Sequence, residues 1–127
     1  MSDRIVLTLP PERALHNVAR LVVGGLAVRL NLTIESLEDL QVALDGLLPE
    51  VRGEPTVSVA VAAGSLEVTV GPFEPEAFRS SLERESDDGV GLRRVLGTVT
   101  DSFDSFKRDG EQWVELRKSV DRAEQKA

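Results

Sequence analysis

The residues best suited to chemistry in this sequence form a short glycine motif, Gly89-Val90-Gly91-Leu92, which opens an apolar helical pattern. Backbone N–H groups at the start of a helix bind anions, and glycines let a phosphate approach the backbone closely. The motif therefore predicts a phosphate contact at Gly89, Gly91 and Leu92. The simpler alternative is a turn that leads into a helix, because a single Gly-x-Gly motif is a weak signal.

Four carboxylates crowd the segment just before this motif, at Glu83, Glu85, Asp87 and Asp88. Carboxylates beside a polyphosphate oppose its binding unless metal ions intervene. The neighbouring arginines offset this charge only in part. We interpret the acidic run as a solvated loop rather than a metal site.

The elements that would position the motif follow from hydrophobic periodicity. Residues 4–9 alternate as a strand, and 55–70 and 101–118 each predict a β-hairpin, the second around the turn dipeptide Asp109-Gly110. Helical spacing covers 12–30, 33–48 and 91–99, and 76–85 fits a short helix.

This order predicts an α+β fold with two layers. We expect a mixed, mostly antiparallel sheet of about five strands, covered on one face by three helices. Residues 1–120 form one domain and residues 121–127 a polar C-terminal tail.

Three local signals refine the helices. Thr33 is a good N-cap for the second helix, and Pro49 ends that helix because proline forces its predecessor out of the helical region. Gly24-Gly25 lowers the stability of the first helix and predicts a kink or a close backbone contact.

Composition narrows the class of partner. The 127 residues carry a formal net charge of -7, which disfavours nucleic acid and anionic membranes. The absence of cysteine excludes disulfides and thiolate chemistry, and no apolar leader or long apolar span is visible. We expect a cytoplasmic protein.

Two single residues have ordinary structural interpretations. His16, the only histidine, is predicted to be a surface or interface residue, and Trp113 is predicted to lie in the core or at a subunit interface.

The order of elements resembles the GHKL ATPase fold, and within it the small anti-sigma-factor serine kinases of bacteria. The stretches that carry the resemblance are Arg20–Ala27, similar to the first helix of that branch, Leu37–Asp45, similar to the run into its Asn-containing motif, and Gly89–Leu96, similar to its second glycine motif. It spans nearly the whole chain.

The resemblance implies ATP and Mg²⁺ as cofactors if the site still works, but the catalytic positions depart from the family pattern. Gly46 aligns with the acidic residue that activates the attacking group, and Glu50 with the Asn that holds Mg²⁺. Asp45 is a weak substitute for the catalytic acid, because one residue is about 100° around a helix. Glu50 is likewise a weak metal ligand, placed just beyond Pro49.

The family also reads adenine with an Asp just before a Gly-x-Gly after the second hairpin strand. No acid lies between Glu67 and Glu74 here, although Gly71 follows the strand. The expectation is therefore that the adenine contact is lost and that no cofactor is bound.

We therefore interpret the chain as an anti-sigma-factor-like regulator that binds a sigma factor or an anti-anti-sigma antagonist. In this interpretation it is not an enzyme. One alternative is an active ATP- and Mg²⁺-dependent serine kinase that phosphorylates the antagonist. Another is a dimerising scaffold module, since the resemblance implies a homodimer.

Overall fold

The computed structural model describes residues 4–12, 14, 16–29, 33–62, 64–84 and 91–119. The elements are β1 (Arg4–Thr8), α1 (His16–Arg29), α2 (Ile34–Leu47), the 3-10 helix η2 (Leu48–Glu50), β2 (Thr56–Ala62), β3 (Ser65–Phe73), α3 (Pro75–Glu83), α4 (Leu92–Val99), β4 (Ser102–Arg108) and β5 (Glu111–Ser119).

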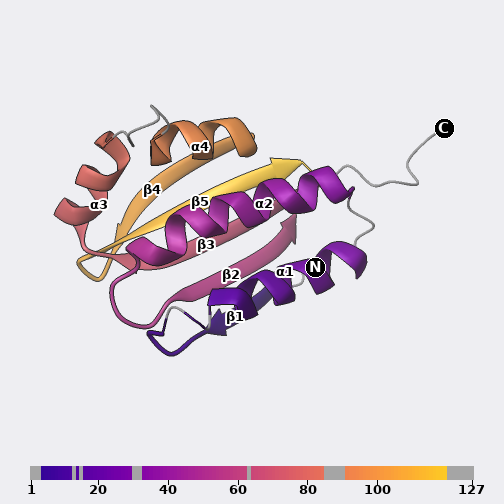
Figure 1. The fold of residues 1–127 in the computed structure, drawn as a ribbon, viewed down its shortest axis with the longest axis horizontal. Helices are drawn as coiled ribbons and strands as arrows, with labels where there is room; N and C mark the ends of the chain where they lie inside the picture. The colour runs from indigo at the N-terminus through magenta and orange to yellow at the C-terminus, as the bar shows by residue number, and fades with distance from the viewer. Residues whose placement is uncertain are drawn as a thin grey trace.

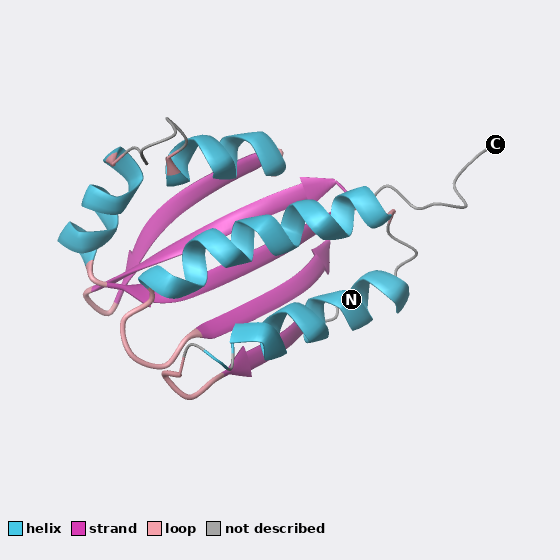
Figure 2. Cartoon of the chain, viewed as in Figure 1, coloured by secondary structure: helices cyan, strands magenta, loops and turns pink. Residues whose placement is uncertain are grey.

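The five strands form one sheet in the order β1-β2-β3-β5-β4, and every neighbouring pair is antiparallel. The α-helices lie on one face of this sheet, so the fold has two layers (Figures 1 and 2). The predicted α+β class and the five strands are confirmed. Two details differ: the described strands contain no parallel pair, and four α-helices cover the sheet rather than three, because residues 75–83 form α3.

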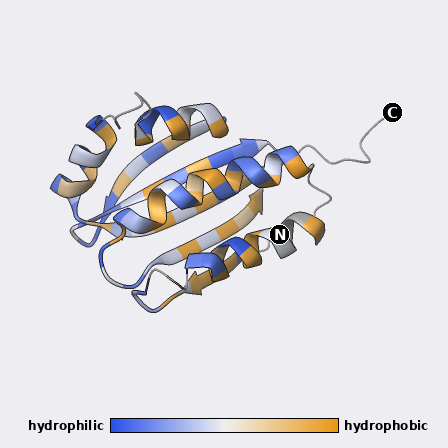
Figure 3. Cartoon of the chain, viewed as in Figure 1, coloured by the Kyte–Doolittle hydropathy of each residue, from blue (hydrophilic) through white to orange (hydrophobic). Residues whose placement is uncertain are grey.

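The core lies between the helices and the sheet. Alternate residues of the central strands point into it, among them Val68, Val70, Val114 and Leu116, all almost fully buried. The apolar stripe of α2 meets them with Leu40, Ala43, Leu44 and Leu47. Hydrophobic colour predominates along β2 (Figure 3), as expected for a strand with a buried face.

The opposite face of the sheet is largely polar. Arg117 of β5 pairs there with Glu67 at 3.8 Å and with Glu115 at 3.0 Å. Thr8 and Thr56 share a 3.0 Å hydrogen bond between β1 and β2. A polar, ion-paired face is stable in water, so the fold leaves this side of the sheet without a second helical layer.

β3 extends further than its sequence suggests. The predicted hairpin ends at residue 70, but the strand continues through Gly71 and Pro72 to Phe73. The register with β5 shifts between Val70 and Phe73, and the Gly71–Pro72 peptide is cis. The register shift accommodates proline within the strand, and pairing with β5 resumes at Phe73 and Gln112.

The helix signals are mostly confirmed. The hydroxyl of Thr33 accepts a hydrogen bond from the Ser36 N–H at 3.1 Å, as an N-cap does. α2 ends at Leu47, and Pro49 lies in the 3-10 turn that follows. The first helix starts at His16, later than predicted. It runs through Gly24 and Gly25, where an added Cβ would meet nothing within 4 Å, so the expected close contact there is wrong.

The second hairpin turns at Asp109 and Gly110, both with positive φ (54° and 81°), as a type I′ turn requires. The C-terminal tail, residues 121–127, lies outside the described residues. None of the helices in the described part of the chain has the length and apolar character needed to cross a lipid bilayer.

Candidate functional site

α2 is the helix around which the predicted site residues are arranged. It lies between α1 on one side and α4 on the other (Figure 1). On the α4 side, a Cβ built on Gly46 would come within 2.9 Å of the Leu92 Cδ1 atom. The structure therefore brings together Gly46 and Leu92, and the leucine fills the space that an acidic side chain at position 46 would need.

Asp45 points to the other side of α2. Its carboxylate lies 3.5 Å from Nε of Arg20 on α1, and the same guanidinium donates to Gln41 at 3.5 Å. Asp45 and Gly46 thus face different neighbours of α2, Asp45 facing α1 and Gly46 facing α4, as the angle of about 100° between successive helical residues allows. Asp45 links two helices and does not face the start of α4.

Glu50, the weak candidate for a metal ligand, is engaged by α3. Ser81 donates its hydroxyl proton to the Glu50 carboxylate at 2.6 Å, and Arg84 lies 3.9 Å from its second oxygen. Ser81 is buried, so this short hydrogen bond fixes the end of η2 against α3. An ion at Glu50 would have to replace both partners.

Gly91 is buried and forms the N-cap of α4 with extended backbone angles (φ −99°, ψ 168°). Its carbonyl accepts the first helical hydrogen bond, from the Val95 N–H at 3.0 Å. This geometry matches the predicted helix entry. Gly89, the other glycine of the motif, and the acidic residues Asp87 and Asp88 lie outside the described residues.

Gly71, the glycine near which the resemblance implies a lost adenine contact, lies inside β3 and is covered by an aromatic ring. A Cβ built on it would fall 2.5 Å from Cε3 and 2.7 Å from Cδ2 of Trp113 on β5. Arg108 stacks over the same ring, 5.3 Å from its centroid. The indole therefore replaces the missing side chain of Gly71, and Trp113 belongs to the sheet packing.

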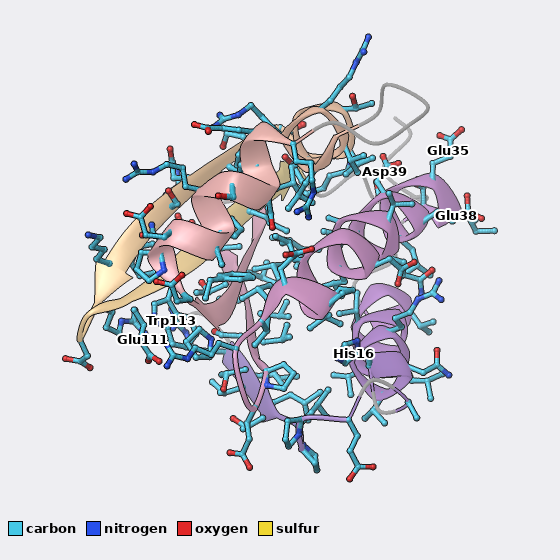
Figure 4. The ribbon with its side chains drawn as sticks, turned by 60° about the vertical axis from the view of Figure 1, so that its left-hand side comes forward. His16, Glu35, Glu38, Asp39, Glu111 and Trp113 are labelled. Atoms are coloured by element: carbon cyan, nitrogen blue, oxygen red, sulfur yellow. The ribbon has the colours of Figure 1, made fainter. Side chains whose placement is uncertain are left out.

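His16 and the acidic side chains of the described residues are dispersed over the fold. His16, at the start of α1, lines a hollow of about 240 Å³ with Pro49, Val51 and Pro55. Glu35, Glu38 and Asp39 gather at the amino-terminal end of α2, well away from Trp113 and Glu111 at the start of β5 (Figure 4). Within the described ranges, no three His, Asp or Glu side chains come together as a metal-ligating group.

Exposed apolar side chains concentrate on the first two helices. Leu21 and Val28 of α1 are 68% and 77% exposed, and Ile34, the first residue of α2, is 72% exposed. Leu21 and Val28 are seven residues apart and therefore share one side of α1. We call these three residues the α1–α2 apolar surface. Large exposed hydrophobic residues on neighbouring helices are a feature of protein interaction sites.

Two partners in this region are not visible in the sequence. Ser81 and Arg84, which hold Glu50, belong to a segment for which periodicity gives only a possible short helix. Leu92 was expected to offer its N–H to a phosphate, whereas its side chain is what decides the packing beside Gly46. The one sequence feature that could have indicated this packing is the glycine at position 46, where the resemblance implies an acid.

No protein-family model matches this chain, and no curated protein matches it.

Proposed function

We propose that this chain is a regulator of the anti-sigma-factor type, which works by binding a sigma factor or its antagonist and not by phosphoryl transfer. It would act in the bacterial cytoplasm. The α1–α2 apolar surface carries the proposal, because exposed leucine, valine and isoleucine on neighbouring helices are suited to bury area against a partner.

The surroundings of Gly46 support the second half of the proposal. Leu92 occupies the volume beside Gly46, Asp45 is turned toward Arg20, and Glu50 is held by Ser81. None of these three contacts leaves a carboxylate next to the start of α4, where the resemblance would put the phosphates. Among the described residues, positions 45, 46 and 50 therefore offer a transferable phosphoryl group neither a base nor a metal ligand.

The α1–α2 surface also carries acidic residues. Glu35 directly follows Ile34, and Glu38 lies about one helical turn after it on α2; both are exposed. A partner that offers apolar side chains ringed by lysine or arginine fits this surface best, because charges at the rim steer association and exclude like-charged partners. A second copy of this chain, with its net charge of -7, is less suited to it.

The test is capture from an extract of the native cell with three baits: the native chain, the Leu21→Asp/Val28→Asp variant, and a Val6→Asp variant. Val6 is also exposed, at 59%, but lies on β1 and serves as the matched control. A sigma factor or an antagonist protein should bind to the native chain and to the control but not to the double variant. Recovery of neither class of protein on the native bait would overturn the proposal.

Calorimetric titration with a non-hydrolysable ATP analogue and Mg²⁺ separates this proposal from the kinase alternative. We expect no heat at protein concentrations that would reveal micromolar binding. Binding would favour the active serine kinase. Light scattering addresses the scaffold alternative, in which the chain dimerises through the same surface. A dimer that Leu21→Asp/Val28→Asp dissociates would support the scaffold.

A further inference from the structure

A cleft of about 320 Å³ opens on the other side of α2 from the α1–α2 apolar surface, between α3, the start of α4 and the β4–β5 hairpin. Its floor includes Phe78, which is buried against the ring of Phe73 with 4.4 Å between ring centroids, and the half-buried Leu82. The α3 and α4 helices that frame it lie together in Figure 1, separated from α1 by α2.

Three cations from three different elements surround this floor: Arg79 of α3, Arg93 of α4 and Lys107 of β4. Within the described residues, none of the three forms an ion pair or a side-chain hydrogen bond. Among the described residues that line the cleft, Glu83 is the single carboxylate. By this count the cleft has an excess of two positive charges, in a protein with a formal net charge of -7.

This local reversal of charge has an energetic consequence. Like charges held around one hollow repel each other, whereas an anion placed among them gains from all three. Elsewhere in the described chain, Arg20, Arg84, Arg117 and Lys118 are each paired with a carboxylate. The cleft is thus the place where unpaired positive charge and a recessed apolar surface coincide.

We propose that this cleft binds an acidic peptide segment of a partner protein, with an apolar side chain seated on Phe78 and Leu82 and carboxylates on either side of it. The three cations are exposed and come from separate elements, which suits several carboxylates spaced along a chain rather than one compact anion. The site does not depend on the α1–α2 apolar surface, and a partner bound there would leave the cleft free.

The experiment measures fluorescence anisotropy of a labelled peptide in which Asp and Glu alternate with Leu and Phe. A second peptide, with Asn and Gln in place of the acids, is the ligand control. The Arg79→Gln/Lys107→Gln variant should weaken binding of the acidic peptide about tenfold, since it removes two exposed charge pairs, each of which contributes modestly to affinity. Arg4→Gln, which removes an exposed cation from β1, at the edge of the sheet opposite β4, should leave binding unchanged.

Glu83→Gln provides a readout that misfolding cannot imitate, because removing the one carboxylate of the cleft should tighten binding severalfold. Addition of salt should weaken it. Equal binding of the amide peptide would overturn the proposal, and so would unchanged binding by the double variant. Full competition by millimolar citrate or inorganic phosphate would assign the cleft to small anions instead. Binding to phosphatidylserine vesicles but not to the acidic peptide would assign it to a membrane surface.

Discussion

Leu92, the first residue of α4, packs its side chain against Gly46 of α2, and a Cβ on that glycine would lie only 2.9 Å from the leucine Cδ1. Carbon atoms of different side chains do not pack at that distance, so a side chain at position 46 would require Leu92 to move. In the resemblance to the anti-sigma-factor kinases, position 46 corresponds to their acidic residue, and Leu92 belongs to the motif that corresponds to their phosphate-binding glycines. In this chain the same two positions make an apolar helix contact.

The contact predicts energetic coupling between positions 46 and 92. Gly46→Ala gains helix propensity of about 1 kcal/mol but displaces the Leu92 methyl group, so its net effect in the native chain is small. In a Leu92→Ala background the displacement disappears, and Gly46→Ala should stabilise by about 1 kcal/mol. Urea unfolding of the four proteins measures the coupling. Equal effects of Gly46→Ala in both backgrounds would contradict the packing described here.

Gly71 and Trp113 predict a larger effect of the same kind. A Cβ at position 71 would lie 2.5 Å from the indole Cε3, and the Arg108 guanidinium also lies over this ring, 5.3 Å from its centroid. Gly71→Ala should therefore lower the free energy of unfolding by about 2 kcal/mol, as overpacking does. Trp113, the only tryptophan, reports the change through its fluorescence.

Gly97→Ala is the matched control for this substitution. Gly97 is exposed on α4, and an added Cβ there meets nothing within 4 Å. It should stabilise by up to about 1 kcal/mol through helix propensity alone. If both glycine variants changed stability in the same direction, crowding by the indole would not be the cause at position 71.

The layers of this fold could be predicted because each element carries its own local signal. Alternation at 57–61 and 66–70 marks two strands, Asp109-Gly110 fixes a hairpin turn, and Thr33 caps a helix. The predicted end of β3 was wrong, because Gly71-Pro72 looks like a local strand break whereas pairing with a distant strand decides where β3 ends. β3 continues over Gly71 and Pro72 because β5 covers this irregular stretch with Trp113.

The candidate site was harder to predict, because its contacts join elements far apart in the sequence. That Asp45 faces Arg20 follows from the direction in which α1 crosses α2, and that Ser81 reaches Glu50 follows from the placement of α3. Neither the crossing of α1 over α2 nor the placement of α3 can be predicted from the periodicity of a single helix. The sequence shows that position 46 lacks an acid, but it does not show that the Leu92 side chain occupies the space beside it.

Asp39 and Lys118 predict an asymmetric response to the loss of one charge. They form a 2.8 Å ion pair between α2 and β5, in which the Lys118 side chain is 15% exposed and the Asp39 side chain 40%. Asp39→Asn leaves a largely buried lysine without its counter-charge, whereas Lys118→Met keeps the apolar stem and leaves an accessible carboxylate. Asp39→Asn should therefore destabilise by about 1–2 kcal/mol, and Lys118→Met by less. Denaturant unfolding that gave the reverse order would show that the pair is solvated.

Asp101 links the start of β4 to the end of β5 and predicts a dependence of stability on pH. The Ser119 hydroxyl and the Ser119 backbone N–H both donate to its carboxylate at 2.7 Å. These hydrogen bonds, the hydroxyl first, lower the pKa of Asp101 below its ordinary value. Because the folded protein has the lower pKa, the unfolded state binds the proton more readily, and protonation favours unfolding.

The stabilisation from Asp101 is thus complete above the pKa of an unfolded aspartate, about 3.9, and is lost as the pH falls through the lower folded pKa. The difference in unfolding free energy between the native chain and Asp101→Asn should be constant near neutral pH and shrink below about pH 4. Ser119→Ala, which keeps the backbone donor, should show a smaller lowering of the Asp101 pKa by NMR titration. A native-minus-variant difference that does not change with pH would mean that the carboxylate gains nothing from Ser119 in its charged form.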